Sequence, residues 1–452
     1  MTAELRCYRP LIIGRRGAVA ANHPLAAQAG LLALRAGGNA VDAAVATAVA
    51  LAVVEPMMSG LGGDGFYQVY DQVSGRAVVF NGSGPAPAAA TPERYAGTIP
   101  RIGPLSVSVP GMLAGIAAMH QRFGRLPWRD LFVEAIAFAR DGFAATPHYR
   151  HLTGEYRATL AVDPTSAASF LVDGEAPPVG ATIVQPALAD TLEEVASEGA
   201  ETFYRGRLAR RLAAGLAAVG SLVSAADLAG FVAETQEPIA IDYCGFTVLE
   251  APPNSTGFVL LEELKILEHF DLAAMGLLSA DLVHVMVEAK KLAFADRERW
   301  AADPRTVAAP LAELLSADYT ARLAGLIDMR RRADPDGGRC RRRHHLFLHG
   351  RWRRQRGFRC PEHQQRIWVR CRGRRHRGSA QQPHGLLAPR SRASQPAAAG
   401  AAGASHDEPA AGAQRQRVLV CLWHTRCRQP SAGQYANPDG NDRFRSRPAT
   451  GG

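Results

Sequence analysis

Apolar and polar residues follow helical and strand periods along the first three quarters of the chain. The spacing of apolar residues predicts a helix over 24–36, with Pro24 in its first turn and Gly37-Gly38 at its end. Residues 40–54 are apolar on all sides, which predicts a helix buried on every side. The runs 66–70 and 77–80 then predict two strands joined by a turn at Ser74-Gly75.

The rest of this region continues as a mixture of helices and strands. We predict a helical hairpin over 110–123 and 128–143, helices over 191–198 and 208–219 with a short one opening at 225–228, a strand-like run over 238–249, and long amphipathic helices over 258–270 and 280–300. This mixture indicates the α/β or α+β class. No stretch of about 18 uncharged apolar residues is present, so the sequence predicts no membrane span.

Composition changes sharply near residue 338. Residues 338–452 hold 24 Arg, no Lys and 5 acidic residues, a net charge of +19, whereas residues 1–337 carry a net charge of −9. Within the tail, arginine recurs at every second or third place over 339–377 with no apolar stripe, so we predict little order there. The break therefore predicts two regions, a globular one over 1–337 and a basic, low-order tail over 338–452.

The tail suggests two kinds of chemistry. Its cysteines never fall at the C-x₂₋₄-C spacing that a tetrahedral zinc site needs, which excludes that metal site, and the seven cysteines of the whole chain form no disulfide framework. Arginine-rich segments bind RNA by charge. An Arg-tailed nucleic-acid-binding protein is therefore one hypothesis, although no recognition module is present.

A glycine-rich segment in the globular region has the spacing of a dinucleotide-binding turn. Gly60-Leu61-Gly62-Gly63-Asp64-Gly65 fits G-x-G-x-x-G, but that motif must follow a strand and open a helix so that the helix N-terminus receives the pyrophosphate. Here a predicted helix precedes the segment and strands follow it. We therefore predict a loop of close backbone approach, either a plain turn or the floor of a site.

Other polar residues have structural explanations. Asn254-Ser255-Thr256-Gly257 opens a predicted helix; capping alone explains the Ser and Thr, and an active-site role stays open without being required. His23 and His284 are isolated, which favours structural roles. The pairs Glu288/Lys291 and Asp296/Arg299 have i,i+3 spacing typical of a solvated helix face. The sequence shows no Ser/His/Asp order and no G-x-S-x-G elbow, and it implies no metal or cofactor.

Several motifs together resemble the γ-glutamyltransferase (γ-glutamyltranspeptidase, glutathione hydrolase) family. The resemblance covers roughly residues 15–330 and rests on the combination of motifs rather than on any one of them. The matching stretches are Ala18 to Ala26, Leu34 to Ala46, Glu55-Pro56, Ser59 to Phe66, Pro110-Gly111, Phe123-Gly124-Arg125-Leu126-Pro127, Pro252 to Gly257 and Glu288 to Arg297.

The resemblance implies an N-terminal-nucleophile hydrolase fold, an αββα sandwich, of which this chain holds the large-subunit part. Members of the family are proenzymes that cut themselves into a large and a small subunit. The new N-terminal Thr attacks a γ-glutamyl or related amide, with its own α-amine as the base. The large subunit supplies an Arg that binds the substrate carboxylate after the second strand.

This chain departs from that pattern at the carboxylate-binding position. Ser83 stands where the Arg is expected, and Pro85 stands where some branches carry one. The acyl group therefore stays open between γ-glutamyl, cephalosporin-type and oxamate-type amides. We expect a small-molecule amide as partner, with no specific nucleic acid and no membrane. The N-terminus shows no secretory signal, which favours the cytoplasm.

The Thr-Thr of the small subunit is absent, and a shifted reading frame accounts for it. If each codon is read one nucleotide later, the genetic code permits Thr-Thr at His344-His345, Asp-Asn-Ala-Val-Ser-Val over 354–359 and Gly-Thr-Pro-Gly-Ala-Asp-Asn over 423–429. These match, in order, the family's nucleophile, the strand after it and its oxyanion hole. We infer a one-nucleotide insertion or deletion between Met329 and Cys340, either in the gene or in its determined sequence. The prediction is a family proenzyme whose present product is inactive.

Overall fold

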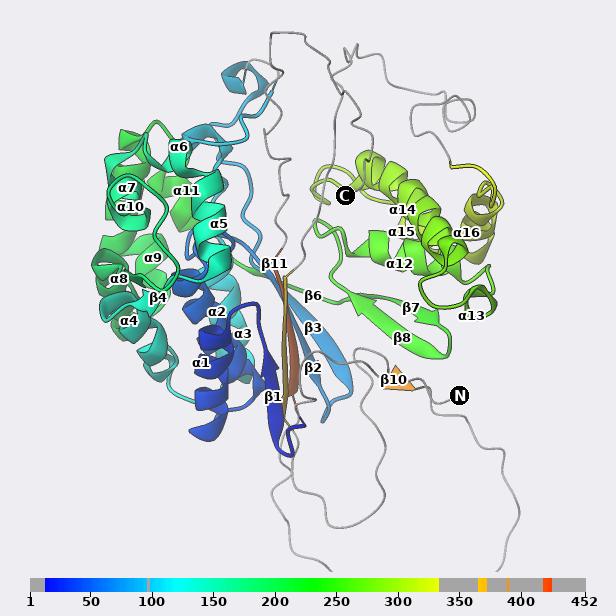
Figure 1. Ribbon diagram of the computed structural model, residues 1–452, viewed down its shortest axis with the longest axis horizontal. Helices are drawn as coiled ribbons and strands as arrows, with labels where there is room; N and C mark the ends of the chain where they lie inside the picture. Colours follow the sequence, from blue (N-terminus) through cyan, green and yellow to red (C-terminus); the bar gives the residue numbers. More distant parts are fainter. Residues whose placement is uncertain (1–12, 96–97, 333–364, 372–387, 390–417, 425–452) are drawn as a thin grey trace, which may run out of the picture.

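An antiparallel six-stranded sheet forms the centre of the protein (Figure 1). The computed structural model describes residues 13–95, 98–332, 365–371, 388–389 and 418–424. In spatial order the strands are β1 (Gly17–Ala20), β9 (Gln365–Cys371), β11 (Val418–His424), β2 (Phe66–Asp71), β3 (Arg76–Asn81) and β6 (Glu234–Gln236). Two segments of the Arg-rich tail thus lie between β1 and β2.

A first layer of helices covers one face of this sheet. The inner helices are α1 (Pro24–Arg35), α2 (Ala40–Val54) and α3 (Met112–Phe123). Outside them lie α4 (Val133–Arg140), α5 (Pro147–Glu155), α6 (Arg157–Leu160), α7 (Pro164–Phe170), α8 (Pro186–Glu198), α9 (Glu201–Arg205), α10 (Arg207–Ala218), α11 (Ala225–Gly230), the short strands β4 (Phe143–Ala144) and β5 (Thr182–Ile183), and 3₁₀ turns at Pro92–Tyr95, Pro104–Ser106 and Trp128–Leu131.

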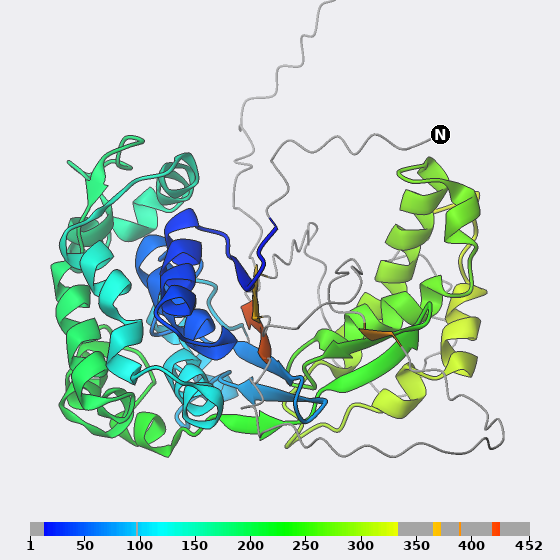
Figure 2. The same cartoon turned by 90° about the horizontal axis from the view of Figure 1, so that it is seen from below.

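A second sheet and a second helical layer lie on the other side. The sheet is the hairpin β7 (Ile239–Tyr243) and β8 (Phe246–Glu250), extended by β10 (Ala388–Pro389). The helices are α12 (Gly257–Leu267), α13 (Leu272–Met275), α14 (Ala280–Trp300), α15 (Leu311–Leu314) and α16 (Ala317–Ala324). Figures 1 and 2 show the resulting order: helices, sheet, sheet, helices.

The predicted all-round burial of the second helix is confirmed. All fifteen residues of α2 are buried, and Asn39 caps the helix by accepting hydrogen bonds from the backbone N–H groups of Val41 and Asp42. The buried Asp42 carboxylate accepts from the N–H groups of Asn39, Arg125 and Leu126. This motif therefore joins α2 to the turn that follows α3. No helix in the described part of the chain is long and apolar enough to cross a bilayer.

Two of the predicted elements are divided in the structure. The strand-like run 238–249 is the hairpin of β7 and β8, with positive φ at Cys244 (48°) and Gly245 (82°) in the turn. The second arm of the predicted helical hairpin, 128–143, is a 3₁₀ turn, then α4, then the strand β4. A Cys-Gly pair is a weak turn signal, and a two-residue strand has no period to detect.

The prediction that the tail lacks order is wrong for three segments. β9 pairs with β1 and β11, β11 pairs also with β2, and β10 pairs with β8. The edges of β1 and β2 are thus paired. The hydrogen bonds between paired strands join backbone groups, so strand pairing is compatible with most side chains. An Arg-rich segment that contains the β-forming residues Ile367, Trp368 and Val369 can therefore still form a strand.

The prediction of a solvated face on α14 is wrong as well. Glu288 and Asp296 are 3% and 8% exposed. Glu288 does bind Lys291, with Oε1 2.6 Å from Nζ. Asp296, however, accepts a hydrogen bond from the hydroxyl of Tyr319 on α16 (2.6 Å) and faces Glu262 on α12. The i,i+3 spacing does bring Glu288 and Lys291 together, but α12 and α16 pack against this side of α14 and bury it.

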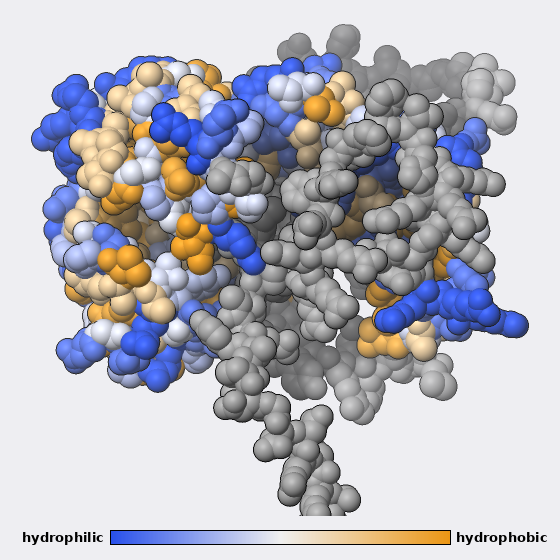
Figure 3. Space-filling view, turned by 90° about the horizontal axis from the view of Figure 1, so that it is seen from above, coloured by the Kyte–Doolittle hydropathy of each residue, from blue (hydrophilic) through white to orange (hydrophobic). Residues whose placement is uncertain are grey.

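Polar and apolar residues are mixed on the face of the molecule in Figure 3. Wherever that face is coloured, hydrophilic residues in blue alternate with apolar residues in orange. Large exposed apolar side chains include Leu277 and Leu278, between α13 and α14. Scattered exposure of this kind is expected and needs no functional explanation.

Candidate active site

The glycine loop meets two other backbone segments at the end of β3. The Gly63 carbonyl accepts hydrogen bonds from the N–H groups of Gly111 and Met112, both at 2.9 Å. Gly65 and Gly82 bond each other through their backbones, which continues the pairing of β2 and β3. The loop is therefore a point of close backbone approach, as predicted, and it positions Asp64 beside the turn after β3.

This approach leaves no room for side chains at the turn. A Cβ on Gly84 would lie 1.5 Å from the carbonyl oxygen of Val109, and a Cβ on Gly111 would lie 2.2 Å from that of Gly82. Both neighbours are backbone atoms that cannot move aside independently. The small residues here thus fix the position of Ser83.

We expect Gly84→Ala to lower the free energy of unfolding by about 3 kcal/mol, because the added methyl group forces the turn away from Val109. Urea unfolding followed by circular dichroism measures the change. Gly62→Ala is the matched control, since a Cβ there meets no atom within 4 Å. Equal midpoints for the two variants would contradict the role given to this contact.

A closed polar cluster holds Ser83. Its N–H donates to Oδ1 of Asn81 (2.9 Å), and its Oγ accepts from Nδ2 of Asn254 (3.0 Å). The amide of Asn81 in turn donates to Oδ1 of Asn254 (2.9 Å). Asp64 lies next to this cluster, with Oδ2 3.5 Å from the Ser83 hydroxyl. Three segments, two of them more than 170 residues apart in sequence, thus meet at one hydroxyl group.

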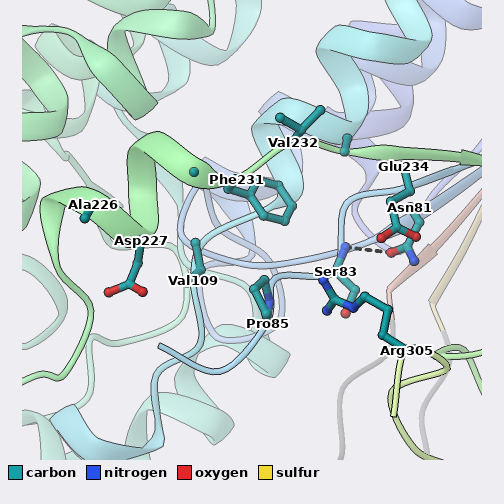
Figure 4. Close-up of a pocket in the computed structure, with 12 residues that line it drawn as sticks. Asn81, Ser83, Pro85, Val109, Ala226, Asp227, Phe231, Val232, Glu234 and Arg305 are labelled. Carbon is teal, nitrogen blue, oxygen red and sulfur yellow. Dashed lines mark hydrogen bonds between the residues drawn. The ribbon is translucent and has the colours of Figure 1, made fainter. Parts of the chain in front are cut away.

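A pocket of about 490 Å³ opens beside this cluster (Figure 4). Its polar and charged lining comes from Asn81, Ser83, Asp227, Glu234 and Arg305, and its apolar lining includes Pro85, Val109, Phe231 and Val232. A cavity with apolar walls and a few polar groups is the usual form of a small-molecule site.

Sequence reasoning placed Ser83 and Pro85 at the substrate position, and both line this pocket. It favoured a helix-capping cluster for Asn254 to Gly257 and left an active-site role open, without singling out Asn254. In the structure Ser255 accepts from the N–H of Gly257, whereas Asn254 turns to Ser83. Sequence reasoning missed Arg305, which no motif marks. His344, where the nucleophile is expected, lies outside the described residues.

The two histidines make structural contacts. His23 caps α1 by accepting from the N–H of Leu25, and burial lowers the pKa of its imidazole. His284 hydrogen-bonds the carbonyl of Asp328. Over the ranges that the structure describes, no group of three or more His, Cys, Asp and Glu residues is placed to hold a metal ion.

The layer order and the site at the end of the central strands define a class of protein. The fold is an αββα sandwich of the N-terminal-nucleophile hydrolase type. The gamma-glutamyltranspeptidase family model matches residues 26–349, and the chain belongs to this family.

Individual relatives agree with this assignment. The chain is 39% identical over 341 residues to the acylase ACY 1 proenzyme of Pseudomonas sp. (strain V22), covering 72% of this chain and 61% of the relative. It is 38% identical over 324 residues to the oxamate amidohydrolase proenzyme of Klebsiella pneumoniae, covering 70% and 61%. The crystal structure of Helicobacter pylori gamma-glutamyltranspeptidase superposes with a TM-score of 0.68 at 30% identity, covering 71% of this chain and 94% of that one. The chain thus spans less than two thirds of the length of these two curated relatives.

Proposed function

We propose that this chain is the large-subunit part of an amide-hydrolysing or acyl-transferring proenzyme that lacks its nucleophile. The observation that carries the proposal is the place where the family match stops. The match runs to residue 349 and so ends just after His344-His345, where the family resemblance places the nucleophilic Thr. The Arg-rich composition begins at Arg339, within the last residues of the match, and a shifted reading frame explains it.

The pocket at Ser83 binds the acyl group of the substrate in this proposal. Its position after β3, its volume and its mixture of polar and apolar walls suit a small amide. Catalysis needs an attacking group and donors for the developing oxyanion. The frame change removes both from the encoded protein, so the chain binds without turning over.

Resequencing of the source DNA across codons 325–350, together with an assay of the purified chain on γ-glutamyl-p-nitroanilide, tests this proposal. We expect no turnover above the uncatalysed rate with the 452-residue chain. Steady hydrolysis that copurifies with the chain would oppose the proposal. A base gained or lost in the new DNA sequence would show that the natural product is the intact proenzyme.

A further inference from the structure

Among the described residues that line the pocket beside Ser83, Arg305 is the one cationic side chain. The family resemblance placed an arginine at position 83 instead. Arg305 lies in the loop between α14 and α15, about 220 residues beyond Ser83 in the sequence. Figure 4 shows its side chain reaching toward Ser83 and Pro85, while Asp227 lies at the opposite end of the pocket. The positive charge that position 83 lacks is therefore present in the same pocket.

A neighbouring carboxylate fixes the orientation of Arg305. Asp303 accepts from Nε of Arg305 (2.9 and 3.2 Å) and from Nη2 (2.6 Å), so it occupies one side of the guanidinium. In the described part of the chain, Nη1 of Arg305 makes no hydrogen bond with a protein group. The edge formed by Nη1 and Nη2 is the one that takes a second carboxylate in a two-point contact.

The acidic side chains of the lining are already engaged. Asp227 accepts from the N–H groups of Ser224 and Ala88 and from the Ser224 hydroxyl, and Glu234 accepts from Nε2 of Gln236. Asp303, and more weakly Glu234, raise the pKa of Arg305 and keep it charged. The Arg305 edge beside Ser83 is thus the place in this pocket that favours an anion.

We propose that Arg305 is the specificity residue that binds the carboxylate of the acyl group, in place of the arginine expected at position 83. Ser83 contributes its hydroxyl to the same carboxylate, and Asp303 positions the guanidinium. The proposal rests on the proposed function for the identity of the pocket. It assigns substrates with a free carboxylate near the amide, and it disfavours neutral acyl groups.

Binding of L-glutamate and of oxamate to the full 452-residue chain, measured by calorimetric titration, tests this assignment. We expect at least one of the two to bind and Arg305→Gln to weaken that binding by at least about ten-fold, with Arg305→Lys intermediate because lysine lacks the two-point fork. Arg157→Gln is the matched control: Arg157 is also exposed and paired with an acidic residue, Glu175, but lies outside the pocket.

A second variant distinguishes loss of the positive charge from general damage to the fold by Arg305→Gln. Ser83→Arg, introduced into the Arg305→Gln chain, is expected to restore binding because it returns a guanidinium to the same pocket. Binding of neither ligand, or unchanged binding in Arg305→Gln, would overturn the assignment. Self-cleavage of a frame-restored chain does not depend on Arg305, so the proposed function and this inference can fail separately.

Discussion

Restoring the reading frame after Met329 is expected to give a chain that cuts itself once and hydrolyses γ-glutamyl or related amides at least about 10³-fold faster than the present one. The reason is that loss of an attacking side chain in a hydrolase typically costs several orders of magnitude in turnover. In the proposed function, the frame change removes the Thr expected at position 344, together with the oxyanion-hole donors. Electrophoresis with N-terminal sequencing of the fragments measures the cut, and release of p-nitroaniline measures turnover.

The control is the same restored gene with an alanine codon at the position of His344. This variant is expected to remain uncut and inactive, because both self-cleavage and hydrolysis use the same hydroxyl group in the proposed mechanism. A restored chain that stays whole while folding normally would contradict the proposed function. Cleavage at another position would contradict the assignment of the nucleophile to position 344.

Glu262→Gln is expected to stabilise the chain at neutral pH by about 3 kcal/mol and to flatten the pH dependence of its stability. Glu262 is fully buried on α12, and neither of its carboxylate oxygens has a hydrogen-bond donor. Burial raises the pKa of this carboxyl group to about 10, and the nearby charge of Asp296 adds to the shift. A Glu262 that stays protonated beside Asp296 explains how two buried carboxyl groups can share one site.

The direction in which pH changes the stability follows from the protonation of Glu262 in the folded and unfolded states. The unfolded carboxyl group releases its proton near pH 4.5, whereas the folded one keeps it up to about pH 10. The folded state therefore holds the extra proton in this window, and stability falls as pH rises through it. Denaturant midpoints of the parent chain and the variant between pH 4.5 and pH 9 measure the effect.

The matched control is Glu298→Gln, which changes an exposed carboxylate on the neighbouring helix α14. We expect its midpoints to follow those of the parent at every pH. A parent chain whose stability rises from pH 5 to pH 9, or a Gln variant that is less stable at pH 8, would show that Glu262 is ionised in the folded protein.

The sequence predicted local structure correctly wherever one local signal, such as an apolar run or a turn residue, was strong. The burial of α2 followed from fifteen residues with little polar character, and the turn between β2 and β3 followed from Ser74-Gly75. The short helix expected to open at 225–228 is α11, and Ser224 caps it. These signals act over a few neighbouring residues, so the sequence carries them directly.

The site could be predicted only in part. The close backbone approach of the glycine loop was predicted correctly because its glycines mark it. Ser83, which the family resemblance marks, lines the pocket, and its role in binding substrate stays a prediction. Asn254 was assigned to a cap since its neighbours are good capping residues, yet it bonds Ser83 from 171 residues away. Arg305 had no local signal at all. Its place in the pocket depends on how the loop after α14 returns to the central sheet.

The sequence by itself determined several elements of residues 24–300, among them α1, α2, β2, β3, α12 and α14, together with the family resemblance and the composition break near residue 338. Tertiary structure alone decided which polar groups meet: Asn254 with Ser83, Arg305 with the pocket, and Glu262 with Asp296. It also decided that tail segments pair with β1 and β2. The physical reason is the sequence separation of the interacting residues. Periodicity and capping act between neighbouring residues, whereas burial and strand pairing depend on distant segments that only folding brings together.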